Sequence, residues 1–599
     1  MPVKSLPPRD KVKPADAWDL TPLFASDAAW EKAFRKWVAL IPKYQEFAGK
    51  LGDSAQQLAS FLDFDNEFER LGERLSTYAF LKTTEDQANS KYQELLGRYR
   101  HAASQAGQAG SFFRPELMAI PAAKMQKFLK SAELAPHLIS LNRILRYKAH
   151  TLTPGEEKLL AMQAEMSETP NLVFRQLNDT DLKFGVVENE RGQKIELSSA
   201  TFMNFLYSPA RKVRETAFHQ FYEEYAAHAN TLAATLSGSI QRDVYYAKAR
   251  NFPSALENAL FPDKVPLAVY DNLIAAVRRH LPALHHYYEV RRRRMKLKAI
   301  HHYDTYVPIL AERQTKHTWQ QAVQVILSSL KPLGSEYCGV LEKGLNNGWC
   351  DRYPNRGKQS GAFSCGSFDG PPYILMNYQP EVLDQVFTLA HEAGHSMHSF
   401  YSAKHQPFQY YNYTIFVAEV ASTFNEQLLG RMMLDQATDD AQRAYLLNRE
   451  IDAIRGTIFR QTMFAEFEKS THALAEAGET LTLDRLRGTY RELLDAYFGP
   501  KFAIDDCLSL ECLRIPHFYR AFYVYKYATG LAASIALSEK VLAGGKAELD
   551  AYLGFLKGGC SRDPLELLRG AGVDMEQAGP VDTALARFEK LVDELDELL

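Results

Sequence analysis

The chain is poor in cysteine, and its cysteines are not spaced like those of a metal or disulfide motif. Six cysteines occur in 599 residues, and no two of them form a C-x-x-C pair. So few thiols cannot build a disulfide framework, and we expect them to stay free in a reducing compartment. The N-terminal residues also lack the apolar core of a signal peptide. The sequence therefore predicts a cytoplasmic protein.

Long hydrophobic runs and a surplus of one charge are missing as well. No uninterrupted apolar stretch reaches about 18 residues, which argues against a membrane span. The chain has 70 lysines and arginines against 73 aspartates and glutamates, whereas a general nucleic-acid binder needs a large basic surplus. The basic run at residues 291–294 is interpreted as a solvated helix face. We expect neither nucleic acid nor membrane as a partner.

Strand signals are rare, whereas apolar residues recur at helical spacing along most of the chain. Trp30, Phe34 and Trp37 form one such stripe behind Ser26, a candidate N-cap. No repeat of fixed period is present, which argues against a solenoid array. The sequence therefore predicts a mostly α fold. Strand signals are confined to four short segments, residues 182–187, 194–197, 360–365 and 373–378.

The first two strand segments form a predicted hairpin, which divides the chain into two regions. Residues 1–198 are an N-terminal helical region that ends in this hairpin, and residues 199–599 are the second region. The other two segments flank an Asp-Gly-Pro-Pro turn, at which a small β element is expected. An edge strand within residues 362–365 or 373–377 could pair with an extended peptide, although a purely structural hairpin is an equal alternative.

The most informative stretch is His391-Glu392-Ala393-Gly394-His395, an H-E-x-x-H motif. On a helix, His391 and His395 lie on one face, about 6 Å apart along the axis. Both imidazoles can therefore reach one Zn²⁺, and Glu392 can address a water in the open coordination position. With 17 histidines in the chain, chance produces roughly 0.03 such matches. The motif predicts a zinc site on a helix.

A catalytic zinc site needs a third protein ligand. His398 lies about 10.5 Å of helical rise beyond His391, too far to share the metal easily, so we expect it to support the site without binding zinc. The metzincin motif is excluded because positions 398 and 401 are not glycine and histidine. A later apolar helical segment contains Glu419, where an unpaired charge would be costly. Glu419 is the predicted third ligand, and Glu426 is its rival.

These motifs resemble those of the thimet-oligopeptidase-type zinc metallopeptidases, and within them the oligoendopeptidase F branch. The resemblance is firm over roughly residues 200–590 and loose before them. The first 198 residues are similar to the N-terminal region of that branch, and residues 199–599 to its catalytic zinc-peptidase domain. Four further segments are similar to the same branch: Phe416–Val420, Arg460–Glu468, Ile515–Tyr519 and Phe522–Gly530.

The resemblance implies a two-lobed helical body with a deep substrate channel, a small β element beside the zinc helix and one Zn²⁺ per chain. It also implies a histidine and two tyrosines that donate to the tetrahedral oxygen, and one such donor is worth roughly 3–4 kcal/mol. His517, Tyr519 and Tyr525 match these roles, with Tyr525 favoured. The spacing after His517 is shorter than in thimet-type relatives, which keeps Tyr523 open as an alternative.

Together these features predict a zinc-dependent endopeptidase that hydrolyses internal bonds of short unstructured oligopeptides through a metal-activated water. Glu392 is the predicted general base. One alternative is a zinc carboxypeptidase that trims peptide C-termini. In that case Arg514, Arg520 or Lys526 would bind the charged end of the substrate peptide. The other is a non-catalytic, zinc-stabilised peptide-binding protein, although Glu392 argues against it because a structural zinc site needs no base. Short peptides are the expected partners, and both a monomer and a small homo-oligomer remain open.

Overall fold

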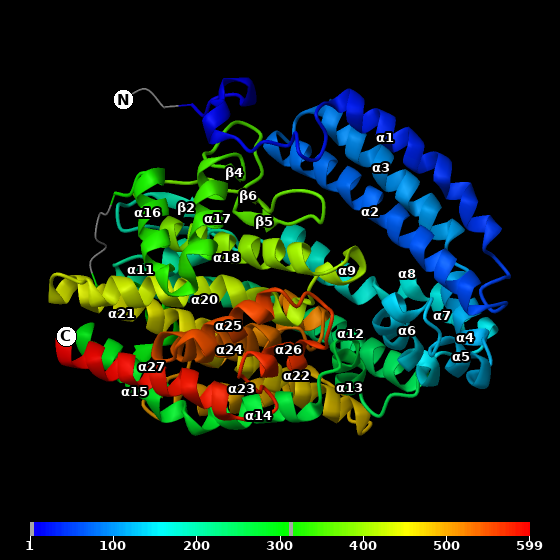
Figure 1. Cartoon of the computed structure of the whole chain (residues 1–599). Helices are drawn as coiled ribbons and strands as arrows, with labels where there is room; N and C mark the ends of the chain where they lie inside the picture. Colours follow the sequence, from blue (N-terminus) through cyan, green and yellow to red (C-terminus); the bar gives the residue numbers. More distant parts are fainter. Residues whose placement is uncertain (1–4, 311–315) are drawn as a thin grey trace. The chain divides into compact units, whose positions relative to one another are not determined.

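The computed structural model describes residues 5–310 and 316–599 and is mostly helical, as predicted (Figure 1). Its described residues contain seven short strands in three small sheets. The contacts within the chain divide it into two units, each built from three separate segments of the sequence. The first comprises Met1–Thr151, Gln314–Arg431 and Leu537–Gly572, and the second comprises Leu152–Arg313, Met432–Ala536 and Val573–Leu599. The predicted regions 1–198 and 199–599 divide the sequence at a different place from these contact-based units. The two regions therefore stay a prediction.

The first unit begins with long helices that share an aromatic core. Ser26 caps α1 as predicted, because its hydroxyl accepts the Ala29 N–H at 3.2 Å. Trp30 and Trp37 are buried on α1, and the Trp37 ring stacks 4.8 Å from that of Phe68 on α2. The helices of this part are α1 (Asp27–Leu40), α2 (Ala55–Glu85), α3 (Ser90–Ala109), α4 (Phe113–Ala119), α5 (Ala122–Phe128) and α6 (Leu138–Leu145).

The rest of the first unit contains the H-E-x-x-H helix and the sheet beside it. The sheet has the order β4-β6-β5, with β5 antiparallel and β4 parallel to the central β6, so β5 is an edge strand. Both predicted strand segments are thus confirmed. β5 and β6 contact α18. The elements are α16 (Trp319–Ser329), α17 (Gly334–Asn346), β4 (Cys350–Asp351), β5 (Phe363–Cys365), β6 (Tyr373–Leu375), α18 (Asp384–His405), α19 (Phe408–Tyr411), α20 (Ile415–Asp435), α25 (Lys546–Leu556) and α26 (Pro564–Gly570).

The second unit opens with short helices and the predicted hairpin. Its strands β1 (Val186–Glu188) and β2 (Lys194–Glu196) pair antiparallel, with Val187 opposite Ile195. The basic run at 291–294 is only in part a solvated face, because Arg291 is buried and donates to the Asp304 and Val307 carbonyls. The other elements up to this point are α7 (Pro154–Met162), α8 (Ala164–Ser167), α9 (Thr169–Gln176), α10 (Phe202–Leu206), α11 (Arg211–Ala227), α12 (Ala229–Ala249), α13 (Ala255–Leu260), α14 (Leu267–Arg279) and α15 (Leu281–Arg294).

The later part of the second unit contains the aromatic segment singled out by the sequence. A short 3-10 turn at Pro516–Tyr519 is followed by α24, which begins at Tyr525. The parallel strands β3 (Ile300–His301) and β7 (Phe502–Ala503) form the third sheet. The helices are α21 (Asp440–Ile454), α22 (Arg460–Glu476), α23 (Leu483–Phe498), α24 (Tyr525–Ala543) and α27 (Gly579–Leu598). Over residues 5–310 and 316–599, no helix combines the length and apolar character needed to cross a membrane.

Candidate metal centre

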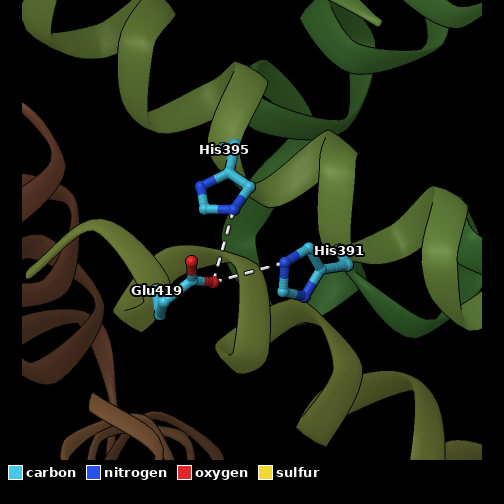
Figure 2. A group of neighbouring side chains, drawn as sticks. All are labelled: His391, His395 and Glu419. Atoms are coloured by element: carbon cyan, nitrogen blue, oxygen red, sulfur yellow. Dashed lines mark ion pairs between the residues drawn. The ribbon is translucent and has the colours of Figure 1, made fainter. Parts of the chain in front are cut away.

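Two helices of the first unit bring three predicted ligands together. His391 and His395 project from adjacent turns of α18, with ring centroids 4.9 Å apart. Figure 2 shows Glu419 of α20 facing both rings; its Oε2 lies 3.3 Å from Nε2 of His391 and 3.4 Å from Nε2 of His395. One ligand atom from each residue lies within 4.8 Å of the other two. Two imidazoles and one carboxylate that converge in this way fit a zinc ion with an open fourth position.

The close approach of α18 and α20 depends on Gly394. A Cβ atom at this position would overlap the Ala421 carbonyl oxygen and lie 2.5 Å from Cα of Ser422. Both contacts are with backbone, so no rotamer change could relieve them. Asn425 fixes the same contact, because its side-chain amide donates to the Ala390 carbonyl at 3.2 Å. The two helices can therefore come close enough for Glu419 to reach the histidines.

The two glutamates on α20 contact different atoms of His391. Whereas Glu419 faces Nε2, Glu426 Oε1 lies 2.8 Å from Nδ1. A carboxylate on Nδ1 keeps the proton there and leaves Nε2 available to a metal. Glu419 itself is oriented by Ser422, whose hydroxyl donates to Oε2 at 3.0 Å. The geometry thus gives the two glutamates distinct positions, one beside the metal-binding atoms and one behind a ligand.

Protons compete with a metal for these atoms. Burial lowers the pKa of His391, but hydrogen bonds to Glu419 and Glu426 outweigh burial and raise this pKa to about 10. Burial raises the pKa of Glu419, but hydrogen bonds from His391 and His395 hold it well below its usual range. A metal would replace the shared protons, so its binding must release them.

Glu392 is buried next to the first histidine and faces the small sheet. Burial raises its pKa, while the charges of His391 and His395 and a hydrogen bond from the Ser364 backbone lower it. Ser364 belongs to the edge strand β5, and its hydroxyl also bonds to that of Ser396 on α18 at 2.8 Å. The edge strand is thereby attached to the helix that contains the predicted base.

His398 lies outside the group of converging ligand atoms. Its ring is buried and stacks in parallel on Tyr413 at a centroid distance of 3.7 Å. Burial lowers the pKa of His398 to about 3, which keeps the ring neutral. The hydroxyl of Tyr413 lies 3.1 Å from that of Ser399 and 3.5 Å from the His395 carbonyl. Sequence reasoning did not place Tyr413 beside the metal motif, because its contact with α18 depends on how the segment after this helix folds back on it.

The aromatic segment lies in the second unit, where two of its predicted donors are buried. The Tyr519 hydroxyl lies 2.8 Å from that of Thr235, and its ring stacks on Phe174 at 4.2 Å. Tyr525 is fully buried, with its ring centroid 5.1 Å from that of Tyr270. Burial raises the pKa of Tyr519, which keeps its hydroxyl protonated and able to donate.

His517 forms a cluster with two other tyrosines. Its ring centroid lies 6.2 Å from that of Tyr523, nearly parallel, and 6.1 Å from that of Tyr527, edge-on. The ring centroids of Tyr523 and Tyr527 are 5.4 Å apart. All three side chains are partly exposed. Sequence reasoning did not choose Tyr527 as a donor, because its position beside His517 depends on the turn that precedes α24.

Comparisons with known proteins match nearly the whole chain. Peptidase family M3 matches residues 204–587, and an Oligopeptidase F family matches residues 116–184. Oligopeptidase PepF of Bacillus subtilis is 43% identical over 596 residues, which cover 99% of this chain and 89% of that protein.

Solved structures extend the similarity to the whole fold. A crystal structure of a peptidase from Chlamydophila abortus is 37% identical with a TM-score of 0.95 and covers 99% of this chain and 100% of that one. The crystal structure of oligoendopeptidase-F from Enterococcus faecium is 34% identical with a TM-score of 0.74 and covers 96% of this chain and 99% of that one.

Proposed function

Because the chain belongs to peptidase family M3 and to its oligopeptidase F branch, we propose that it is a zinc-dependent oligoendopeptidase. It is a metalloendopeptidase that acts on oligopeptides. The proposal adds the metal, the residues that bind it, the catalytic residues and the kind of peptide that is cut. The comparisons give no support to C-terminal trimming or to binding without cleavage.

The convergence of His391, His395 and Glu419 is the observation that supports zinc. We propose that these residues bind one Zn²⁺ per chain, because two imidazoles and one carboxylate with an open position are a donor set of catalytic zinc. When bound, zinc lowers the pKa of a coordinated water to about 7 and polarises the carbonyl of the bond to be cut. Glu426 would hold the His391 ring without binding the metal, as its contact with Nδ1 suggests.

In this proposal, Glu392 is the general base. It takes a proton from the attacking water and delivers it to the leaving amine. The burial of Glu392 supports this role, because burial raises the pKa of the carboxylate and makes it a better proton acceptor.

The donors to the oxygen that becomes negatively charged are proposed to come from the segment 517–527. The sequence predicts His517, Tyr519 and Tyr525 for this role. Tyr523 and Tyr527 are added as candidates, because they lie with His517 and are partly exposed. A hydroxyl placed before the reaction begins stabilises the developing charge without reorganisation.

We further propose that short, unstructured peptides bind in extended form, within a channel that excludes folded proteins. The edge strand β5 supports the extended form, since it offers backbone groups beside α18 that any peptide sequence can pair with.

Two broader proposals concern the division of the chain and the compartment of the protein. Residues 1–198 and 199–599 are separate sequence regions, supported by family matches that end at 184 and begin at 204. The protein is cytoplasmic, supported by six cysteines that are all free.

Mass spectrometry of products from a mixed library of short peptides tests the proposal. Internal cuts that stop with a chelator and return with Zn²⁺ are expected. Release of single C-terminal residues would instead indicate a carboxypeptidase, and binding without products would indicate a binding protein. An unfolded chain of casein length, assayed beside a folded protein, tests the channel. Rapid internal cleavage of the long unfolded chain would contradict confinement by length.

A further inference from the structure

Phe522 has an unusual backbone conformation at the centre of the aromatic segment. Its φ of 58° lies in the left-handed region, which a bulky side chain rarely adopts because Cβ approaches the following carbonyl oxygen. Three other described non-glycine residues have positive φ, and all three are exposed, whereas Phe522 is buried. Strained residues persist only where surrounding contacts impose the conformation.

This residue determines how His517 faces the tyrosines. The 3-10 turn that contains His517 ends before it, and the first turn of α24 begins after it, with the Lys526 N–H bonded to the Tyr523 carbonyl at 3.2 Å. An extended conformation at position 522 would turn α24 away from His517. The cluster of His517, Tyr523 and Tyr527 therefore depends on the left-handed conformation.

A buried carboxyl on α22 holds Phe522 in place. Glu468 Oε1 accepts the Phe522 N–H at 2.9 Å. The Phe522 ring lies 4.5 Å from that of His472, on the next turn of α22, and 6.0 Å from that of Tyr270. The stretch 519–522 also borders a cavity of about 520 Å³. Phe522 is thus contacted by Glu468 and His472 of α22 and by Tyr270 of α14, and Glu468 is the one that bonds to its backbone.

Glu468 is not explained by stability alone. It is 2% exposed, and among the described residues nothing donates to or accepts from Oε2. A buried oxygen without a partner is unfavourable, and the bond that Oε1 accepts from the Phe522 N–H is what the carboxyl supplies in return. Burial raises the pKa of Glu468 well above its usual range; the Phe522 N–H opposes this rise and the charge of Asp243 adds to it. Glutamine at this position keeps an oxygen that can accept the Phe522 N–H.

We propose that Glu468 is a positioning residue of the peptidase, whose carboxyl keeps Phe522 left-handed and thereby holds His517, Tyr523 and Tyr527 in one cluster. This inference rests on the proposed function, in which that segment donates to the substrate. Glu468 acts through the turn and does not touch the substrate.

Two substitutions separate positioning from packing. Glu468→Gln keeps an oxygen that accepts the Phe522 N–H, so its kcat should stay close to that of the wild type. Glu468→Met keeps the volume and removes the acceptor, so kcat should fall by about 10²-fold, the loss that a 1 Å misplacement of a catalytic group can produce. KM and metal content should change little, whereas the melting temperature of Glu468→Met should fall modestly because the buried Phe522 N–H loses its acceptor. Glu466→Met is the matched control, since Glu466 lies on the same helix but pairs with Arg278 at 2.8 Å.

Hydrogen exchange of residues 516–524, followed by mass spectrometry, reports on the turn whether or not peptide is cleaved. Exchange at Phe522 should be faster in Glu468→Met and unchanged in Glu468→Gln and Glu466→Met. A wild type that cleaves no peptide would defeat the proposed function alone. Equal kcat in all variants, equal damage in Gln and Met, or a loss of kcat without faster exchange would overturn the role of Glu468.

Discussion

The metal motif on α18 and the aromatic segment 517–527 both gather reactive side chains within a few residues, but by different means. In the metal motif, helical spacing alone puts His391 and His395 on one face. In the aromatic segment, the left-handed Phe522 interrupts the regular structure, and tyrosines two residues apart have different surroundings: Tyr525 is buried and Tyr523 is partly exposed. Spacing therefore predicts a site well only where one regular element contains it.

The largest expected effect tests the metal side of this comparison. Glu419→Ala should lose most of its zinc and most of its activity, because it removes the proposed ligand whose Oε2 faces both histidines. Glu426→Ala should keep its zinc and lose about 10–100-fold in activity, since its carboxylate orients His391 through Nδ1. Metal analysis after dialysis, beside peptide assays, measures both.

Reversed effects in these two variants would mean that Glu426 is the ligand. The contact of Glu419 with both Nε2 atoms would then not indicate metal binding. Glu336→Ala is the control, because it also removes a carboxylate that contacts α18, but one that pairs at the surface with Lys404 at 3.2 Å. It should retain both zinc and activity.

The second prediction concerns the base within the same motif. Glu392→Gln should keep its zinc and lose about 10²–10⁴-fold in kcat, because the amide cannot accept the proton of the attacking water. Metal content and kcat, measured on one preparation, check this. Residual activity within tenfold of the wild type would falsify the role of Glu392 as general base. Its place next to His391 would then have no catalytic meaning.

The third prediction tests the aromatic side. Tyr523→Phe and Tyr527→Phe remove hydroxyls from the partly exposed cluster with His517, and Tyr519→Phe and Tyr525→Phe remove buried ones. A hydroxyl that donates to the developing charge should cost about 10²–10³-fold in kcat, with little change in KM. We expect this loss at Tyr523 or Tyr527, because they are accessible.

Phenylalanine keeps the ring, so melting temperatures separate packing from catalysis. A large loss of kcat in Tyr525→Phe with normal melting would support the prediction made from sequence and contradict the one made from accessibility. Four normal variants would leave His517 as the remaining donor.

Much of the helical scaffold could be predicted, because its signals are local. Ser26 caps α1 through a contact three residues away, and the 182–197 hairpin is formed by neighbouring segments. The convergence of Glu419 on the two histidines was predicted from an apolar segment that contains one costly charge. The sequence could not tell which histidine atom each glutamate of α20 faces, since that depends on the rotation of α20 against α18.

The arrangement of the tyrosines could not be predicted for a related reason. The conformation of Phe522 is imposed by Glu468, 54 residues earlier in the chain. A phenylalanine carries no local signal for the left-handed region, which glycine or asparagine would have indicated. The sequence thus points to the segment as a candidate, but the surroundings of its hydroxyls depend on the contact with α22.

The smallest expected effect tests whether the metal motif is as local as its spacing suggests. Gly394→Ala adds one methyl group to α18, and helix propensity alone would favour alanine by up to about 1 kcal/mol. The structure predicts the opposite sign. The new Cβ would overlap the Ala421 carbonyl oxygen and lie 2.5 Å from Cα of Ser422, so α18 and α20 must separate. We expect a loss of about 1–3 kcal/mol in unfolding free energy and weaker zinc binding, because Glu419 would move away from the histidines.

Gly97→Ala is the matched control, since position 97 lies within helix α3 of the same unit and has no atom within 4 Å of an added Cβ. It should be neutral or stabilising, because only helix propensity acts there. Thermal unfolding with and without zinc measures both variants. Suppose that Gly394→Ala behaves like Gly97→Ala and keeps its zinc affinity. The metal motif would then need no close contact between α18 and α20, and Glu419 could reach the histidines from a greater distance. If only Gly394→Ala loses stability and zinc together, the metal site depends on tertiary contact as the aromatic segment does, and the two regions differ only in how much of that dependence the sequence reveals.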